Sequence, residues 1–233
     1  MSTRDDLLAS PGRLSRATEN LSSCRRSVGD EARMVRRAAF DCIWKAGVAG
    51  RRELGSMTAL ADEAIDRAIA ELVSAGAAEL DSGGAVVATA GLSGRATART
   101  RHSLSMSGRR FHTWCAIDAI GIPAGVHESA TALTRCGACR TAIEVKLAMG
   151  KVVSPEGPTA WCPASVCDNT IEGFCPYANL FCSEEHLSTW WLDAGSPRGD
   201  ALMLWEVAVL GKAIWGEMSA YVGPVPSRRL SEN

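Results

Sequence analysis

The residues best suited to chemistry lie between Cys115 and Cys182, a segment that holds seven of the nine cysteines. Cys115 and Asp118 are three positions apart, so on a helix their side chains share one face. A carboxylate beside a thiol raises the pKa of the thiol and makes it a poorer nucleophile. The pair is better suited to another division of roles, in which the thiol binds a soft metal ion and the carboxyl group moves a proton. Cys175, between Phe174 and Pro176, offers a second thiol in an apolar setting.

A second group of residues has the types and spacing of a zinc site. Cys136 and Cys139 form a Cys-x2-Cys pair, and Cys182 and His186 lie four positions apart at the expected start of a helix. Four ligands of these types are the number that a structural zinc ion needs. The same spacing also arises by chance, with isolated cysteines and a solvated His186. Structural zinc at these residues is therefore one of two open interpretations.

The composition excludes several classes of protein. A net charge of -1 over 233 residues excludes a protein that binds nucleic acid through its overall positive charge. No apolar run approaches the ~20 residues of a membrane helix, and acidic residues stand at Asp5 and Asp6, where a signal peptide has its apolar core. We expect a cytoplasmic protein with no membrane partner. Clustered cysteines in such a protein favour metal or thiol chemistry over disulfides, although Cys42, in an apolar helical pattern, is expected to be a small core residue.

The N-terminal part of the chain is expected to be a tail followed by a small helical domain. Residues 1–30 are rich in Ser and Arg and lack regular apolar spacing, which predicts a disordered or loosely helical extension. Residues 31–93 show helical spacing and then two short strands around a Gly-rich turn, which is the order of a winged helix. The expected helix at 62–75 would repel phosphate, so we expect a structural or substrate-gating role instead of DNA binding. Its charged residues are Asp62, Glu63, Asp66, Arg67 and Glu71.

The rest of the chain predicts an α+β protein whose second unit, residues 94–222, is a small mixed catalytic domain with short antiparallel strands. Strands are expected at 102–106, 110–113, 130–134, 142–147, 159–161 and 179–181. Helices are expected from Trp114 to Gly121 or Pro123, at 183–191 with Ser183 as the N-cap, and at 204–218. Residues 223–233 contain two prolines and are expected to be a disordered tail.

With these elements in place, the sequence resembles the organomercurial (alkylmercury) lyase family over about residues 31–218. The resemblance rests on a Trp-Cys-Ala-x-Asp helix start and a later Phe-Cys strand, together with the winged-helix-like N-terminal part. The matching residues are Arg109–Asp118, Ile122 and Pro123, Arg135 and Cys136, and Gly173–Cys175. One departure is Pro176, which stands where the family often has another cysteine.

The resemblance implies cleavage of the carbon–mercury bond of an organomercurial by protonolysis. A hydrocarbon leaves, and Hg(II) stays on Cys115 and Cys175, with Asp118 as the proton shuttle. It further implies that catalysis needs no cofactor, that nucleic acid is not a partner, and that Hg(II) is handed over to a mercuric reductase. The winged-helix-like part is implied to pack against the catalytic domain.

Two other functions remain open from the sequence. A thiol-based metal-binding regulator would use the winged helix to read DNA, but it needs a basic recognition helix that residues 62–75 do not supply. A zinc-stabilised, lyase-like protein with a different substrate would keep the fold and change the chemistry. The presence of Asp118 beside Cys115 argues against a simple metal store, which has no use for a proton carrier.

Overall fold

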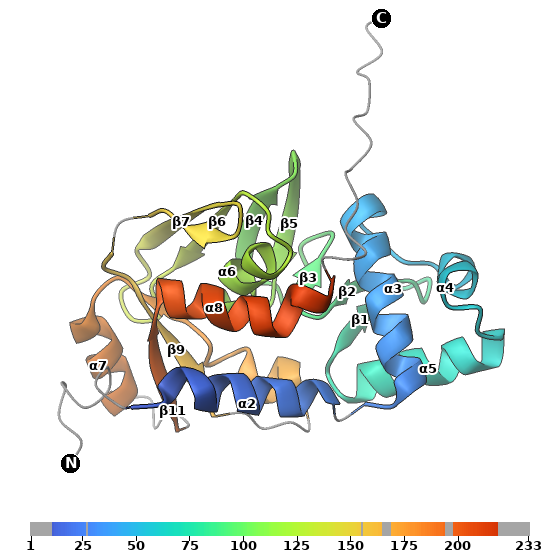
Figure 1. Cartoon of the computed structure of the whole chain (residues 1–233), viewed down its shortest axis with the longest axis horizontal. Coiled ribbons are helices and arrows are strands. Elements are labelled where there is room, and N and C mark those ends of the chain that lie inside the picture. Colours follow the sequence, from blue (N-terminus) through green and yellow to red (C-terminus); the bar gives the residue numbers. More distant parts are fainter. Residues whose placement is uncertain (1–10, 27, 155, 165–168, 194–197, 219–233) are drawn as a thin grey trace, which may run out of the picture.

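The computed structural model describes residues 11–26, 28–154, 156–164, 169–193 and 198–218 (Figure 1). Its helices are α2 (Arg13–Arg26), α3 (Asp30–Ala46), α4 (Arg51–Thr58), α5 (Asp62–Ser74), α6 (Ala116–Gly125), α7 (Glu184–Asp193) and α8 (Leu204–Trp215), with a π-helical turn at Thr170–Phe174 and a 3-10 turn at Gly216–Met218. The expected tail at 223–233 lies outside the described residues. None of the helices described is long and apolar enough to cross a bilayer, and the cytoplasmic location stays a prediction.

The strands form two antiparallel sheets. The larger has eight strands in the order β1-β2-β3-β5-β4-β6-β7-β8, and the smaller has the order β10-β9-β11. Together they confirm the α+β class. The bounds are β1 Ala78–Leu80, β2 Val86–Thr89, β3 Leu92–Ser93, β4 His102–Met106, β5 Arg109–Thr113, β6 Ala130–Arg135, β7 Ala142–Ala148, β8 Lys151–Val152, β9 Thr159–Pro163, β10 Leu180–Phe181 and β11 Gly199–Met203.

Three helices and a hairpin follow one another in the N-terminal part, as the sequence predicts. The turn between β1 and β2 is closed by Asp81, whose carboxylate accepts hydrogen bonds from the backbone N–H groups of Gly83 (2.9 Å) and Ala85 (3.0 Å). The sheet does not end there, because β2 pairs with β3 and β3 pairs with β5. The division expected at residue 93 therefore falls inside a continuous sheet.

The expectation of a disordered extension over residues 1–30 is wrong for α2. This helix lies along α8 and β11 (Figure 1), with Ala17 and Leu21 buried. Arg13 contributes a bidentate ion pair to buried Glu206, with Nε and Nη2 each 2.9 Å from a carboxylate oxygen. The segment is too polar to predict a helix by itself, so it is tertiary contact that stabilises one here.

Helix α6 is the centre of the core, and all ten of its residues are buried. It packs closely on α8 because glycines face each other: a Cβ on Gly211 would lie 2.4 Å from the Cα of Gly121. The expected end of the helix at Gly121 or Pro123 is wrong, since α6 continues through Pro123 to Gly125. A proline inside a helix removes one backbone hydrogen bond, and the burial of the whole helix between α8 and the sheet compensates for it.

Candidate active site

Cys115 lies in the short connection between β5 and α6. It is the N-cap residue of α6, with extended backbone angles (φ -138°, ψ 171°). Its N–H donates to Oδ2 of Asp118 at 3.0 Å, and the N–H of Asp118 donates to the Cys115 Sγ at 3.4 Å. This is a capping box in which a thiol replaces the usual hydroxyl. The local sequence therefore holds the thiol and the carboxyl group side by side at the positive end of a helix.

Cys175 comes from a different part of the fold. It follows the π-helical turn Thr170–Phe174, and its N–H donates to the carbonyl of Thr170 at 3.0 Å. The expected Phe-Cys strand is therefore wrong. Asn169 explains the difference, because its side chain caps the turn by accepting from the N–H of Glu172 at 3.1 Å.

The structure brings the three predicted residues together. One ligand atom from each of Cys115, Asp118 and Cys175 lies within 4.8 Å of the others. Their exposed fractions are 0%, 7% and 4%. A backbone hydrogen bond of 3.1 Å from Ala116 to Ala178 ties the start of α6 to the segment that carries Cys175. Two thiols and a carboxyl group thus converge in a nearly dry site.

Burial controls the ionisation of both thiols. Burial, the hydrogen bond with Cys175 and the Asp118 charge raise the pKa of Cys115 well above its ordinary value. For Cys175, the hydrogen bond from Cys115 lowers the pKa, but burial and the Asp118 charge outweigh it and the net pKa is raised. A raised pKa favours the protonated thiol, so a metal ion that binds both sulfurs has to displace a proton from each.

Gly91 is a site residue that the sequence reasoning missed. It has φ +87°, and a Cβ there would lie 2.4 Å from both Cγ and Oδ1 of Asp118. The neighbouring carbonyl of Ala90 accepts a hydrogen bond of 2.8 Å from Nε1 of Trp215. Only glycine fits between this turn and the carboxyl group. A glycine in the sequence predicts a turn at this position. No neighbouring residue in the chain, however, indicates that the turn contacts Asp118.

A largely apolar cavity of about 60 Å³ adjoins Asp118. Apart from Arg36, Asp118 and Thr170, its walls are apolar side chains and small residues. They come from α2, α6, α8 and the π-helical turn, and from the connecting segments before α3, after α5, at the Gly91 turn and before α6. They include Leu21, Val28, Trp114, Ile117, Phe174 and Trp215. This lining keeps bulk water from the carboxyl group. It also explains why α2 belongs to the site, since Leu21 forms part of the cover.

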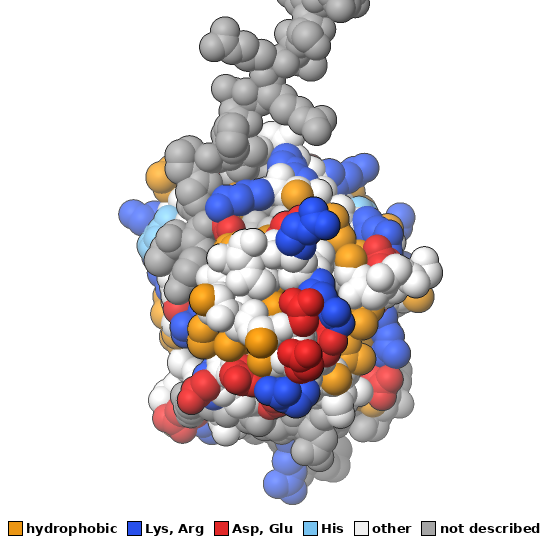
Figure 2. Space-filling view, turned by 90° about the vertical axis from the view of Figure 1, so that its right-hand side faces the viewer, with side chains coloured by type: hydrophobic (Ala, Val, Ile, Leu, Met, Phe, Trp, Pro, Cys, Tyr) orange, Lys and Arg blue, Asp and Glu red, His pale blue; other side chains and the backbone are white. Residues whose placement is uncertain are grey.

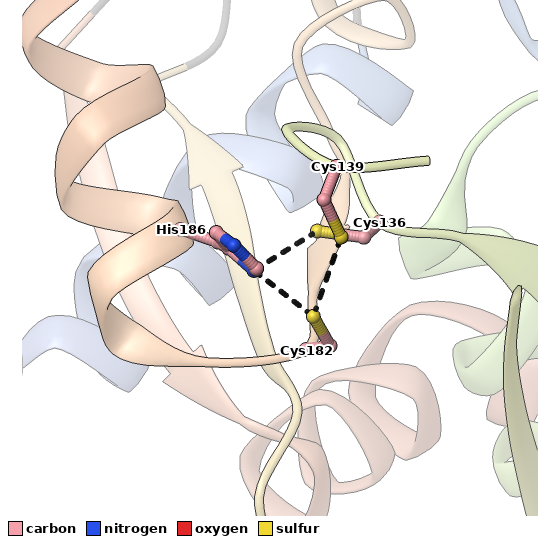
Figure 3. A group of neighbouring side chains, drawn as sticks. All are labelled: Cys136, Cys139, Cys182 and His186. Atoms are coloured by element: carbon pink, nitrogen blue, oxygen red, sulfur yellow. Dashed lines mark hydrogen bonds between the residues drawn. The ribbon is translucent and has the colours of Figure 1, made fainter. Parts of the chain in front are cut away.

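The second predicted group also comes together, apart from the first. One ligand atom from each of Cys136, Cys139, Cys182 and His186 lies within 4.8 Å of the others (Figure 3). Hydrogen bonding with Thr141 lowers the pKa of Cys139 to about 6, whereas burial and the neighbouring thiols raise the pKa of Cys182 to about 11.

Other cysteines stand outside both groups. Cys42 is buried, as expected, with its Sγ 3.5 Å from the Sδ of Met57. Cys162 is fully buried in β9, and its pKa is raised to about 12 by burial and by the charge of Asp200. Cys167 lies outside the described residues, and nothing is described of the Cys24 side chain.

A buried pair of thiols beside a carboxyl group at a helix N-terminus is suited to binding a soft metal ion and moving a proton. The profile of the alkylmercury lyase (MerB) family matches residues 96–216, about half of the chain, so the chain belongs to this family. It cleaves the carbon–mercury bond of organomercurials by protonolysis. No curated protein matches the chain.

The fold has a solved relative. The crystal structure of the mercury-bound form of MerB2 is similar with a TM-score of 0.77 and 17% sequence identity, over 88% of this chain and 99% of that one. The similarity extends beyond the matched profile into the N-terminal helices. At this identity it establishes the shared fold.

Proposed function

We propose that Cys115, Cys175 and Asp118 carry out the cleavage. The observation that supports this most directly is the convergence of their ligand atoms within 4.8 Å in a buried site. Two thiolates are the ligands that a soft ion such as mercury prefers. A carboxyl group within reach of both can take up a thiol proton and return it to carbon. The mercury-bound form of the structural relative agrees with this role.

The order of the steps is proposed from the pairing of Cys115 with Asp118, which leaves Cys175 as the thiol that binds R–Hg⁺ first. The S–H bond of Cys175 breaks as its S–Hg bond forms, and this proton is released from the site. Cys115 then forms the second S–Hg bond, and its proton passes to Asp118, its partner in the capping box. The second sulfur donates electron density to mercury and weakens the bond to carbon.

Protonated Asp118 completes the reaction. Its proton forms the new C–H bond as the C–Hg bond breaks, and the hydrocarbon leaves. Two S–H bonds and one C–Hg bond are lost, and two S–Hg bonds and one C–H bond are formed. Mercury remains Hg(II) throughout, so the cleavage needs no oxidant, reductant or cofactor.

The test is product release by single-cysteine variants. Cys115→Ser and Cys175→Ser should each abolish benzene release from phenylmercury, because serine keeps the shape but is a hard ligand. Cys42→Ser, a buried thiol outside the site, is the matched control and should release benzene at the wild-type rate. Full turnover by either of the first two variants would remove the residue from the proposed chemistry.

Residues 31–93 are proposed to be a winged-helix-like unit with a structural role. Exposed acidic residues line α5, and Arg51 pairs with Asp62 and Asp66. Figure 2 looks at this end of the molecule and shows acidic side chains gathered on the face, with basic side chains beside them. Such a surface does not attract phosphate, which disfavours the regulator alternative. A gel-shift with the purified protein and duplex DNA should show no complex, whereas a salt-sensitive complex would support the regulator.

Hand-over of Hg(II) to a mercuric reductase is proposed because two thiolates hold a soft ion tightly. Incoming thiolates are ligands of the same kind, so we expect the ion to leave the buried sulfurs by ligand exchange and not by spontaneous release. The mercury-loaded enzyme should therefore support NADPH oxidation by a mercuric reductase faster than spontaneous release into a dilute chelator allows. Equal rates would mean that the ion leaves unaided.

A further inference from the structure

The group Cys136, Cys139, Cys182 and His186 lies outside the lyase site and joins two parts of the fold (Figure 3). Cys136 and Cys139 sit in the turn between β6 and β7 of the large sheet. Cys182 follows β10 of the small sheet, and His186 lies in the first turn of α7. No residue is shared with the lyase site.

Three distances between the ligand atoms lie near those of a tetrahedral site. With Zn–S bonds of ~2.3 Å, two sulfurs of a tetrahedron lie about 3.8 Å apart, and a sulfur and a nitrogen slightly closer. The Sγ atoms of Cys139 and Cys182 are 3.6 Å apart. Nδ1 of His186 is 3.0 Å from the Cys182 Sγ and 3.9 Å from the Cys136 Sγ. Small adjustments of the side chains would place one ion at the centre.

The backbone already holds both halves of the site. Arg140, with φ +64°, turns the chain after Cys139, and its N–H donates to the carbonyl of Cys136 at 3.1 Å. The N–H of Gly137 donates to the carbonyl of Leu180 at 2.8 Å, so the turn rests on β10. The Oγ of Ser183 caps α7 by accepting from the N–H of His186 at 3.2 Å, which directs this residue toward Cys182.

The donor set selects the metal. Three thiols and one imidazole are soft and borderline ligands, which exclude Mg²⁺ and Ca²⁺. Four protein ligands also close the coordination shell, so no position is left for a water or a substrate. This differs from the lyase site, which has two thiols and needs an open position for an organic group.

We propose that Cys136, Cys139, Cys182 and His186 bind one structural Zn²⁺ that joins the β6–β7 turn to β10 and α7. The segment from Cys175 to Cys182 then has one end at the lyase site and the other at zinc. If the function proposed for Cys175 holds, zinc also helps to position that thiol.

The test begins with the wild-type protein, purified from cells grown without mercury. Elemental analysis should find about one equivalent of zinc per chain. Replacement by Co²⁺ should produce the intense visible absorption of a tetrahedral thiolate site. Cys139→Ser and His186→Ala should lose the zinc, whereas His186→Cys should keep it, because a thiolate can replace the imidazole. Cys42→Ser and Cys115→Ser are the matched controls and should keep a full equivalent.

Several outcomes would overturn the proposal. One is wild-type protein without zinc, a result that needs no variant to fold. Another is a Cys139–Cys182 disulfide found by thiol counting in place of metal. A third is binding of Hg²⁺ but not Zn²⁺ at this group, which would make it a second mercury site. Zinc content is measured separately from turnover: Cys115→Ser without activity but with zinc would support the zinc site, whatever the outcome for the lyase mechanism.

Discussion

Replacement of Asp118 by Asn separates binding of mercury from cleavage. Oδ1 of Asn can still accept the N–H of Cys115, which Asp118 now accepts at 3.0 Å, so the capping box survives. Loss of a negative charge in the first turn of α6 costs ~0.3–1 kcal/mol. For a chain of this length such a loss lowers the Tm by about 4 °C at most.

The effect on chemistry should be much larger. A positioned general acid contributes ~10²–10⁴-fold to the rate, or about 3–5 kcal/mol at 1.36 kcal/mol per decade. Asn cannot take up the Cys115 proton, so benzene release from phenylmercury should fall by that factor. The Asp118 charge raises the pKa of both thiols. Its removal therefore lowers both pKa values, and Hg²⁺ binding at neutral pH should be retained or strengthened.

The assay measures benzene by gas chromatography and Hg²⁺ binding by titration on the same preparation. Asp41→Asn is the control, because Asp41 is also buried and pairs with Lys45 at 2.8 Å in α3. It should stay within a few-fold of the wild-type turnover. Turnover by Asp118→Asn close to that of the wild type would show that another group donates the proton. Loss of Hg²⁺ binding together with turnover would make Asp118 a ligand or a structural residue.

Two further predictions test the surroundings of the site. Gly91→Ala should lower turnover at least tenfold, because the added Cβ would lie 2.4 Å from the Asp118 carboxyl group. Gly84→Ala is the control: Gly84 has a similar φ of +80°, and its added Cβ would have no atom within 4 Å. This variant should therefore share the backbone strain of ~1–2 kcal/mol and keep its turnover. Equal activity of the two variants would contradict the contact with Asp118. The free energy of unfolding, measured in urea, should fall as the pH rises above 9, since burial raises the pKa of Cys162 from 9.0 to about 12 and the unfolded thiol ionises first. Cys162→Ala should reduce that slope by up to about 1.4 kcal/mol per pH unit, and an unchanged slope would show that this thiol does not titrate as described.

The sequence predicted well those features that depend on neighbours along the chain. Cys115 and Asp118 share a helix start, and their capping box spans only the four residues from Cys115 to Asp118. Ser183 caps α7, and the turn at Asp81–Gly84 joins β1 to β2. Each depends on local backbone angles and on one side chain, which the amino-acid types specify directly.

Predictions failed where packing outweighed local preference. The polar α2 is helical because α8 and β11 cover its Ala17 and Leu21. Helix α6 passes through Pro123 because its whole surface is buried. One failure had a local origin: Phe174 closes a π-helical turn and not a strand, and the side chain of Asn169 caps that turn.

The sequence by itself determined which reactive groups the protein carries: clustered thiols, a carboxyl group one helical turn from Cys115, and two pairs of residues with the spacing of metal ligands. Only the tertiary structure decided that Cys175 reaches Cys115 across 60 positions, that the two pairs come within 4.8 Å of each other, and that Gly91 rests against Asp118. The reason is physical. Spacing along the chain fixes which side chains share a turn or a face, whereas contacts between distant segments depend on the register and order of all the strands between them.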